Sequence, residues 1–320
     1  MKAWIIHNPH AGRFPALPFV ERAARVLQQR GWETVIRQTG GPQDIQRLAA
    51  ACAREGCEAL FVAGGDGTVG QAAKELAGTS TALGVLPAGT ANVFAQELGL
   101  AGLGYTDWFA LEESASKLAS GHVAEMDLGR CNGQVFMLWA GVGLDGYIIG
   151  QVEPRPRTMK HLAVPYYVAA SLWAARGWQG LKLRVQVDQQ LISGKFAQIV
   201  VSNIQRYGGG LFHLAKDARA DDGLLDVWLF EGESAQDALR HAVGLLRGSH
   251  VHHPHVMGLT ARRIHLEAPE PVPWQLDGER YAPAKRFEIE VWPAALRVLL
   301  PQDLPQPLFS GATAKSHRSE

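Results

Sequence analysis

The sequence predicts two domains, an N-terminal α/β domain with a parallel sheet and a C-terminal domain rich in β-strands. Over roughly the first hundred residues, short apolar runs alternate with segments of helical periodicity, an order typical of parallel strands covered by helices. After about Gly121, strand-like runs follow one another with few helices between them. We therefore expect domains at 1–121 and 122–303, with the option that the last strand returns to the first domain.

The elements of the first domain follow from the spacing of apolar residues. Ala3–Ile6 predicts a buried strand, and Phe19–Arg30 places Val20, Ala23 and Leu27 on one helical face. The same reasoning predicts further strands at Glu33–Arg37, Ala59–Ala63 and Ala82–Leu86, and helices at Asp44–Arg54, Val69–Leu76 and Ala91–Leu98.

The second domain is predicted mainly as strands. They are expected at His122–Arg130, Gln134–Ala140, Leu181–Asp188, Ala197–Ser202, Leu225–Phe230, Arg263–Glu267 and Phe287–Val291, with helices at Gly143–Gln151 and Leu162–Trp178. Residues 304–320 carry Pro, Ser, Gly and charged residues, a composition that predicts a flexible tail.

Composition narrows the class of protein. The chain has 320 residues, of which 47% are hydrophobic, and its 31 basic residues equal its 31 acidic ones. A neutral chain is not typical of a general polyanion binder, so no nucleic-acid partner is expected. The three cysteines lack metal-ligand spacing, and no signal peptide or long apolar segment is apparent. We expect a cytoplasmic protein.

The run Gly64-Gly65-Asp66-Gly67-Thr68 follows the predicted strand Ala59–Ala63 directly. Glycines let the backbone approach a phosphate closely, and the N-terminus of the next helix favours the same anion. A carboxylate there cannot bind phosphate itself, but it can hold Mg²⁺ against it. The run predicts a site for a magnesium nucleotide; a tight strand-to-helix turn is the structural alternative.

Two more glycine-containing turns follow neighbouring strands. They are Asn8-Pro9-His10-Ala11-Gly12 and Pro87-Ala88-Gly89-Thr90-Ala91-Asn92. Because parallel sheets bind ligands at the carboxyl ends of their strands, we expect these turns to lie near Gly64–Thr68.

These three runs and Asp277-Gly278-Glu279 together resemble the soluble diacylglycerol kinase and sphingosine kinase-type lipid kinases, including the bacterial members. The resemblance covers about residues 2 to 300. It implies a diacylglycerol kinase-like or NAD kinase-like fold, in which an α/β domain binds ATP and a C-terminal β-sandwich presents the lipid hydroxyl.

The resemblance also implies roles for single residues. Thr39, Thr90 and the run Gly64, Gly65, Asp66, Gly67, Thr68, Val69, Gly70 match positions that contact ATP. Asn8, Pro9, Gly12, Gly89 and Asn92 complete the expected nucleotide site. Asp277 or Glu279 would supply the base that acts on the acceptor hydroxyl, and the sequence leaves the choice open.

A second magnesium site is implied by Arg219-Ala220-Asp221-Asp222-Gly223-Leu224. By resemblance, the Asp222 carboxylate and the carbonyls of Arg219 and Leu224 would hold a structural Mg²⁺. A hairpin turn is the alternative for such a run.

Two residues depart from the family pattern. Gly70 stands where Asn usually follows Gly-Asp-Gly-Thr-Val, and Val93 stands where Asp commonly follows Thr-Ala-Asn. The first removes a polar ATP contact and the second removes a carboxylate. An NAD kinase-like enzyme and a non-catalytic lipid or nucleotide sensor therefore remain as alternatives.

The expected partners are ATP and a lipid substrate at the membrane surface, so we expect peripheral contact with membranes. A diacylglycerol-like or a sphingoid lipid fits equally well, and a homodimer is left open. The aromatic segment Tyr166–Trp178, preceded by Arg155, Arg157, Lys160 and His161, predicts either a lipid-facing surface or an ordinary core helix with a solvated loop. The cluster His250, His252, His253 and His255 is interpreted as a loop before a strand rather than a metal site.

Overall fold

The computed structural model describes residues 1–9, 11–12, 15–41, 43–104, 107–152, 177–305 and 307–310. The chain divides into two compact units. Unit 1 comprises Met1–Asp127, Arg219–Asp222 and Pro293–Glu320, and unit 2 comprises Leu128–Ala218 and Gly223–Trp292. Each unit is described by itself.

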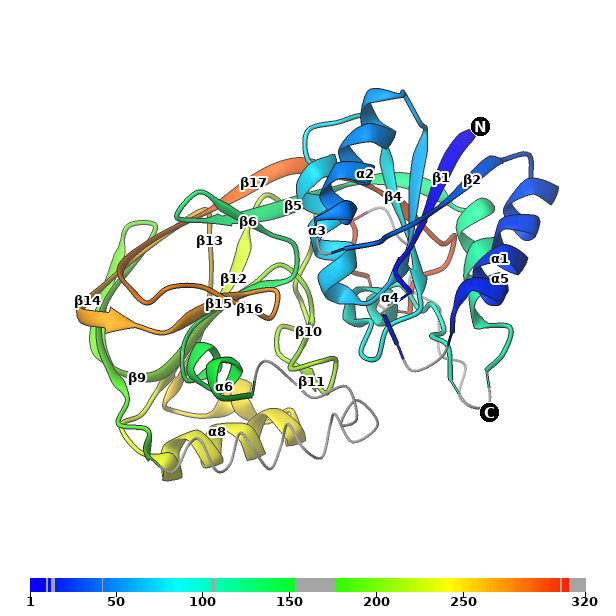
Figure 1. The fold of residues 1–320 in the computed structure, drawn as a ribbon. Helices are drawn as coiled ribbons and strands as arrows, with labels where there is room; N and C mark the ends of the chain where they lie inside the picture. The colour runs from blue at the N-terminus through cyan, green and yellow to red at the C-terminus, as the bar shows by residue number, and fades with distance from the viewer. Residues whose placement is uncertain are drawn as a thin grey trace. The chain divides into compact units, whose positions relative to one another are not determined.

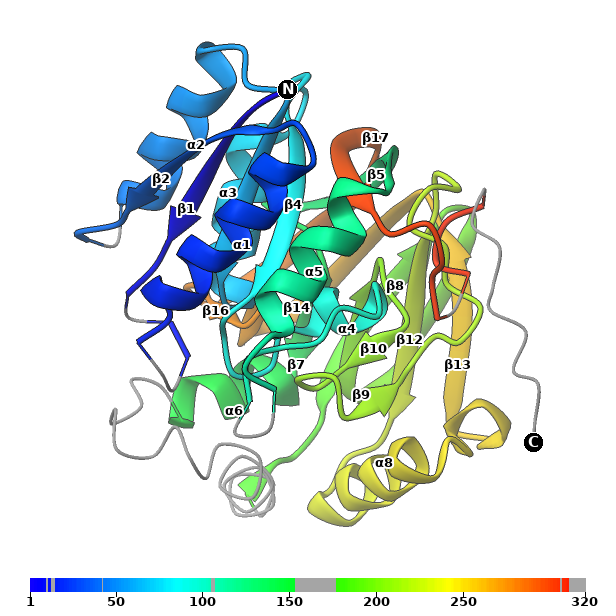
Figure 2. The ribbon, with the colours of Figure 1, turned by 90° about the vertical axis from the view of Figure 1, so that its right-hand side faces the viewer.

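Unit 1 is an α/β unit with a parallel sheet in the order β2-β1-β3-β4 (Figure 1). The end of β17 adds to β4, where Val298 pairs with Leu83 in parallel. Helices α1 and α5 lie on one face of this sheet, and α2 and α3 lie on the other (Figures 1 and 2). Its elements are β1 Lys2–His7, α1 Leu17–Gln29, β2 Glu33–Gln38, α2 Asp44–Arg54, β3 Ala59–Gly64, α3 Asp66–Leu76, β4 Ala82–Pro87, α4 Val93–Glu97 and α5 Ala110–Ala119.

Local sequence explains these elements well. All six residues of β3 and all six of β4 are buried, as expected for strands covered by helices on both faces. Helix α1 has proline in its first turn and buries Val20, Ala23, Ala24 and Leu27, so the predicted helical face is the packed one.

Unit 2 is built from antiparallel strands around a core of Val, Ile, Leu and Phe side chains. Strand β9 is the central element: its first half pairs with β8, and its second half lies between β7 and β12. The elements that lie in or enter this unit are β5 His122–Cys131, β6 Gln134–Phe136, β7 Trp139–Gly143, α6 Leu144–Val152, β8 Leu181–Val187, β9 Gln190–Ser202, β10 Arg206–Tyr207, β11 Phe212–His213, β12 Leu225–Glu231, α8 Ala235–Arg247, η3 His250–His252, β13 Val256–Ala261, β14 Arg263–Val272, β15 Trp274–Leu276, β16 Glu279–Arg280 and β17 Ala284–Leu300.

The structure differs from the sequence prediction at several places, among them strands β13, β15 and β16, which were not predicted. The strand expected at Gln134–Ala140 is interrupted between β6 and β7. Helices α5 and α8 were not predicted. The described part of the expected flexible tail is packed: Leu304, Leu308 and Phe309 are buried, and the Ala220 N–H donates to the Leu308 carbonyl oxygen over 2.8 Å. For these residues the prediction of a tail is corrected, because their apolar side chains join the core of unit 1.

No helix in the described ranges is long and apolar enough to cross a bilayer. The helix predicted at Leu162–Trp178 lies, except for its last two residues, outside the described residues. The basic residues Arg155, Arg157, Lys160 and His161 lie outside them too.

Candidate active site

The predicted nucleotide residues gather at the carboxyl edge of the sheet in unit 1. Strands β1, β3 and β4 are parallel neighbours, so the turns that follow them lie at one edge. The Asn8 N–H donates to the Ala63 carbonyl oxygen over 3.2 Å, and the Ala88 N–H donates to the Gly64 carbonyl oxygen over 3.2 Å. The three turns that the sequence singled out therefore form one cluster.

Two glycines allow the turns to pack backbone against backbone. A Cβ atom on Gly89 would lie 2.3 Å from Gly65 Cα. A Cβ atom on Gly12, whose φ is +71°, would lie 2.1 Å from the Ala88 carbonyl oxygen. No larger residue fits at either position unless the turns move apart. The described residues of the three turns, at 8–12, 64–68 and 87–92, together form a backbone cradle. Gly67, in the first turn of α3, is exposed, so the cradle presents backbone to solvent at a helix N-terminus.

Asp66 links the first turns of two helices. It is the first residue of α3, and its Oδ1 accepts a hydrogen bond from the Phe94 N–H of α4 at 3.4 Å. The side chain is half-buried. Within the described ranges no three His, Cys, Asp or Glu side chains form a metal cluster. Asp66 is thus the candidate carboxylate for a magnesium ion in this cluster.

Polar side chains brace this cluster from within. The Asn8 amide donates to the Thr68 hydroxyl oxygen over 3.1 Å. Asn92, at φ +53°, accepts from the Gly89 N–H at 2.9 Å and donates to the Gly89 carbonyl oxygen at 3.0 Å. Thr39 is only 4% exposed and its hydroxyl donates to the His7 carbonyl oxygen over 3.5 Å. These residues hold the shape of the cradle.

The remaining predicted residues differ in exposure. Thr90 is exposed and Pro9 is half-buried, whereas Val69 and Gly70 are buried in α3. Val93 is 1% exposed at the start of α4. The structure thus brings all of the predicted nucleotide residues to one edge, with the surface formed by Pro9, Gly12, Gly65, Asp66, Gly67, Gly89 and Thr90.

His7, at the end of β1, was not singled out from the sequence. It is 2% exposed, and burial lowers the pKa of its imidazole. A neutral ring is expected there at neutral pH.

In unit 2, the Asp277-Gly278 pair forms the turn of the β15–β16 hairpin. Both residues have positive φ, +50° and +86°, as a two-residue turn of this kind requires. The Asp277 carboxylate accepts three backbone N–H groups, from Met137 at 2.8 Å, Leu138 at 2.8 Å and Trp139 at 3.1 Å. Its oxygens therefore hold the interruption between β6 and β7, a structural role that the sequence did not predict.

Glu279 begins β16, opposite Leu276. Its side chain is half-buried. The hairpin thus gives its two carboxylates different surroundings: Asp277 binds backbone N–H groups of the neighbouring strand segment, and Glu279 stands on the strand after the turn.

A polar relay that the sequence missed lies behind this hairpin. The buried Gln275 accepts from the Gly278 N–H at 2.7 Å and donates to Asp145 Oδ2 at 2.7 Å. Burial raises the pKa of Asp145, and hydrogen bonds from Tyr207 and Gln275 oppose that rise. A Cβ atom on Gly141 would lie 2.3 Å from Asp145 Oδ2, so glycine makes room for the pair.

The segment predicted to bind a structural metal, residues 219–224, is held by hydrogen bonds to residues near the end of the described chain. Asp221 accepts from the Ser310 N–H at 2.8 Å and from the Ser310 hydroxyl at 2.9 Å. The Arg219 guanidinium donates to the Pro307 carbonyl oxygen. Asp222 is exposed beside these contacts. Its binding of Mg²⁺ together with the carbonyls of Arg219 and Leu224 stays a prediction.

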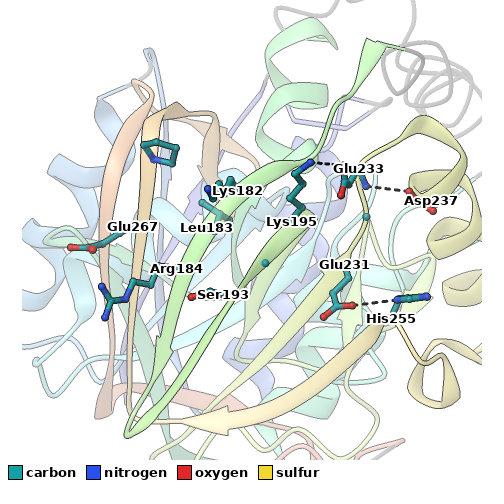
Figure 3. Close-up of a pocket in the computed structure, with 13 residues that line it drawn as sticks. Lys182, Leu183, Arg184, Ser193, Lys195, Glu231, Glu233, Asp237, His255 and Glu267 are labelled. Carbon is teal, nitrogen blue, oxygen red and sulfur yellow. Dashed lines mark hydrogen bonds and ion pairs between the residues drawn. The ribbon is translucent and has the colours of Figure 1, made fainter.

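A separate pocket of about 770 Å³ lies over β8, β9, β12 and β14 of unit 2 (Figure 3). Its charged side chains are largely paired: Lys195 with Glu233 at 2.6 Å, and His255 with Glu231 at 3.3 Å. None of the site residues predicted from the sequence lines it, so it is not part of the candidate active site.

Known families and proteins match nearly the whole chain. The diacylglycerol kinase catalytic domain matches residues 2–131, and the YegS C-terminal NAD kinase beta sandwich-like domain matches residues 140–300. A diacylglycerol kinase of Mycobacterium tuberculosis (strain ATCC 25618 / H37Rv) is 32% identical over 309 residues, covering 94% of this chain and 96% of that protein. A diacylglycerol kinase of Bacillus subtilis (strain 168) is 27% identical over 280 residues, covering 87% and 89%.

A solved structure is similar as well. The crystal structure of a diacylglycerol kinase from Bacillus anthracis str. Sterne has a TM-score of 0.71 and 22% identity, and the match covers 93% of this chain and 96% of that one. At this identity, the likeness shows the fold alone.

Proposed function

We propose that this chain, which belongs to the diacylglycerol kinase catalytic domain family and is a lipid kinase, transfers the γ-phosphoryl group of Mg-ATP to a hydroxyl of a diacylglycerol-like or sphingoid lipid. The family matches favour a lipid kinase over the NAD kinase-like enzyme and the non-catalytic sensor. The nucleotide, the metal and the lipid are our proposal.

The observation that carries the ATP proposal is the backbone cradle at the edge of the sheet in unit 1. The contacts of Gly12 with Ala88 and of Gly65 with Gly89 leave no room for a Cβ atom. Such a cradle suits a phosphate chain, because N–H groups and a helix N-terminus can face its negative charge. Asp66 supplies the carboxylate that a magnesium ion between phosphate and protein needs.

In this proposal, the residues of the nucleotide site position the phosphates and the metal ion or balance their charge. When bound, Mg²⁺ would neutralise the charge that develops on the transferred phosphoryl group. The glycine turns would hold the phosphates, and Asp66 would hold the ion. The inner bonds of Asn8, Thr39 and Asn92 would keep the turns in place.

For the acceptor we propose Glu279 as the base and Asp277 as its support. A base must lie within hydrogen-bond reach of the hydroxyl proton. The Asp277 oxygens already accept three backbone N–H groups, so Asp277 is better suited to fix the hairpin. Glu279 follows the turn directly and carries the second carboxylate of the motif.

The test is a transfer assay with radiolabelled ATP, Mg²⁺ and a total lipid extract, with the product identified by mass spectrometry. We expect a phosphorylated lipid whose formation needs Mg²⁺ and falls in Glu279→Gln and Asp66→Asn. A panel of diacylglycerol, sphingoid base and NAD then identifies the acceptor. Absence of transfer to every lipid, with intact folding, would refute the proposal, and transfer to NAD alone would restore the alternative.

A further inference from the structure

Helix α8 of unit 2 exposes a row of apolar side chains along one flank. Leu239 is 48% exposed and Leu246 is 67% exposed. Val243 stands between them and is half-buried. The spacing of four and three residues places all three on one side of the helix. Ala238, His241 and Leu245 are the residues of the helix that are buried against the unit. The exposed row is therefore additional to the face that packs.

The helix that carries this row is firmly bounded. Ser234 and Asp237 form a capping box at its start, and Gly248, at φ +64°, ends it. Val251, in the turn that follows, is 45% exposed as well. Large exposed apolar side chains grouped on one element are unusual on a surface that faces only water.

Positive charges border the apolar row. Arg240 and Arg247 are both exposed and seven residues apart, so they share the next flank of the helix. Lys216 approaches the end of α8, where a Cβ atom on Gly248 would lie 3.5 Å from its Nζ. The acidic Asp237 caps the start of the helix and pairs with Arg240, three residues further on, at 2.9 Å, whereas Arg247 has no ion pair among the described residues.

We propose that α8 is a membrane-docking helix, which inserts Leu239, Val243 and Leu246 into the surface of a bilayer containing anionic phospholipid. Apolar residues beside arginines are the pattern of helices that lie in the plane of an interface, because the guanidinium groups reach the headgroups while the leucines enter the acyl region. In both views α8 lies at the same end of unit 2 as α6 (Figures 1 and 2). Helix α6 in turn packs on β16, the strand that begins with Glu279. This inference rests on the proposed function, because a lipid kinase must reach an acceptor that lies in a membrane.

The experiment is sedimentation of the full chain with vesicles of phosphatidylcholine alone or mixed with phosphatidylglycerol. Leu239→Gln and Leu246→Gln should each weaken partitioning about tenfold. Arg240→Gln and Arg247→Gln should each weaken it about fivefold, on the mixed vesicles only. Leu191→Gln is the matched control, because Leu191 is 52% exposed on β9 and should leave binding unchanged.

Turnover on a monomeric short-chain diacylglycerol separates this inference from the proposed function. Unchanged turnover there, with reduced vesicle binding, supports the docking helix. Vesicle binding that is the same in all variants, or reduced equally by Leu191→Gln, overturns it even if the enzyme phosphorylates lipid. The apolar row could instead pack against a second copy of the chain, which sedimentation velocity in the absence of lipid tests. A dimer that the α8 variants dissociate would assign the row to that second copy and overturn the docking helix. If the wild type phosphorylates none of the lipids, the kinase proposal is refuted, whereas the result of the vesicle experiment still holds.

Discussion

Asp277→Asn and Glu279→Gln should separate stability from catalysis within one hairpin. Asparagine tolerates positive φ, so the turn itself is preserved at position 277. Its amide oxygen can still accept from Leu138 and Trp139, but its NH₂ group would face the Met137 N–H, which now bonds to Asp277 Oδ2 at 2.8 Å. One donor is left without an acceptor, and the other two bonds lose their charge assistance.

The size of the effect follows from these bonds. A hydrogen bond to a charged group contributes about 1.5–3 kcal/mol, and a buried donor without a partner costs about 1–3 kcal/mol. We expect Asp277→Asn to lower the free energy of unfolding by about 2–4 kcal/mol, which for a unit of this size lowers Tm by about 5–15 °C. Glu279→Gln should reduce kcat by about 10²–10⁴-fold.

The assay is thermal unfolding beside lipid phosphorylation at saturating Mg-ATP, with ATP binding measured by calorimetry. Both variants should bind ATP normally, because the proposed nucleotide site lies in unit 1. The reasoning is refuted if Asp277→Asn keeps its Tm and loses turnover while Glu279→Gln remains active. That result would make Asp277 the base and its hydrogen bonds incidental.

Four further changes test other parts of the site. Asp66→Ala should reduce turnover by about 10²-fold or more while leaving the fold intact; near wild-type turnover at saturating Mg-ATP would exclude Asp66 from metal binding. Gly89→Ala should weaken nucleotide binding measured by calorimetry, because a Cβ atom would lie 2.3 Å from Gly65 Cα; unchanged affinity would mean that the cradle does not hold phosphate. Gln275→Leu should lower kcat with little change in KM for ATP, since it breaks the bonds to Gly278 and Asp145; unchanged kcat would limit the relay to stability. Asp222→Ala and chelation of divalent ions should both lower Tm; if neither does, the segment is only a turn.

The family and the fold class were predictable because their signals are local. The α/β alternation, the β-rich second part and the family resemblance are confirmed by the structure and by the matches to known families. Apolar runs determine buried strands, and glycines after those strands determine where the turns come together. The same local signals exist for α8, where Ser234, Asp237 and Gly248 mark both ends, so this helix was predictable from the sequence although it was not predicted.

Partners distant in sequence could not be predicted. Asp277 binds backbone groups 138 to 140 positions away, and Gln275 binds Asp145, 130 positions away. The polar composition after Leu304 suggested a frayed end, yet Leu308 and Phe309 are buried in unit 1, where the 219–222 segment belongs as well. Such contacts depend on which distant segments the tertiary fold brings together, and the residue spacing within one segment does not contain that information.

The two short acidic motifs illustrate the same difference between local signals, which the sequence shows, and distant contacts, which it does not. In Gly64-Gly65-Asp66-Gly67 and in Asp277-Gly278-Glu279, the glycines determine the local backbone, and this part follows from the sequence alone. The carboxylates act over long distances in the chain: Asp66 accepts from Phe94, and Asp277 accepts from Met137, Leu138 and Trp139. Because the Asp277 carboxylate accepts three backbone N–H groups of its own unit, we propose Glu279 for the acceptor. The comparison of Asp277→Asn with Glu279→Gln tests that choice.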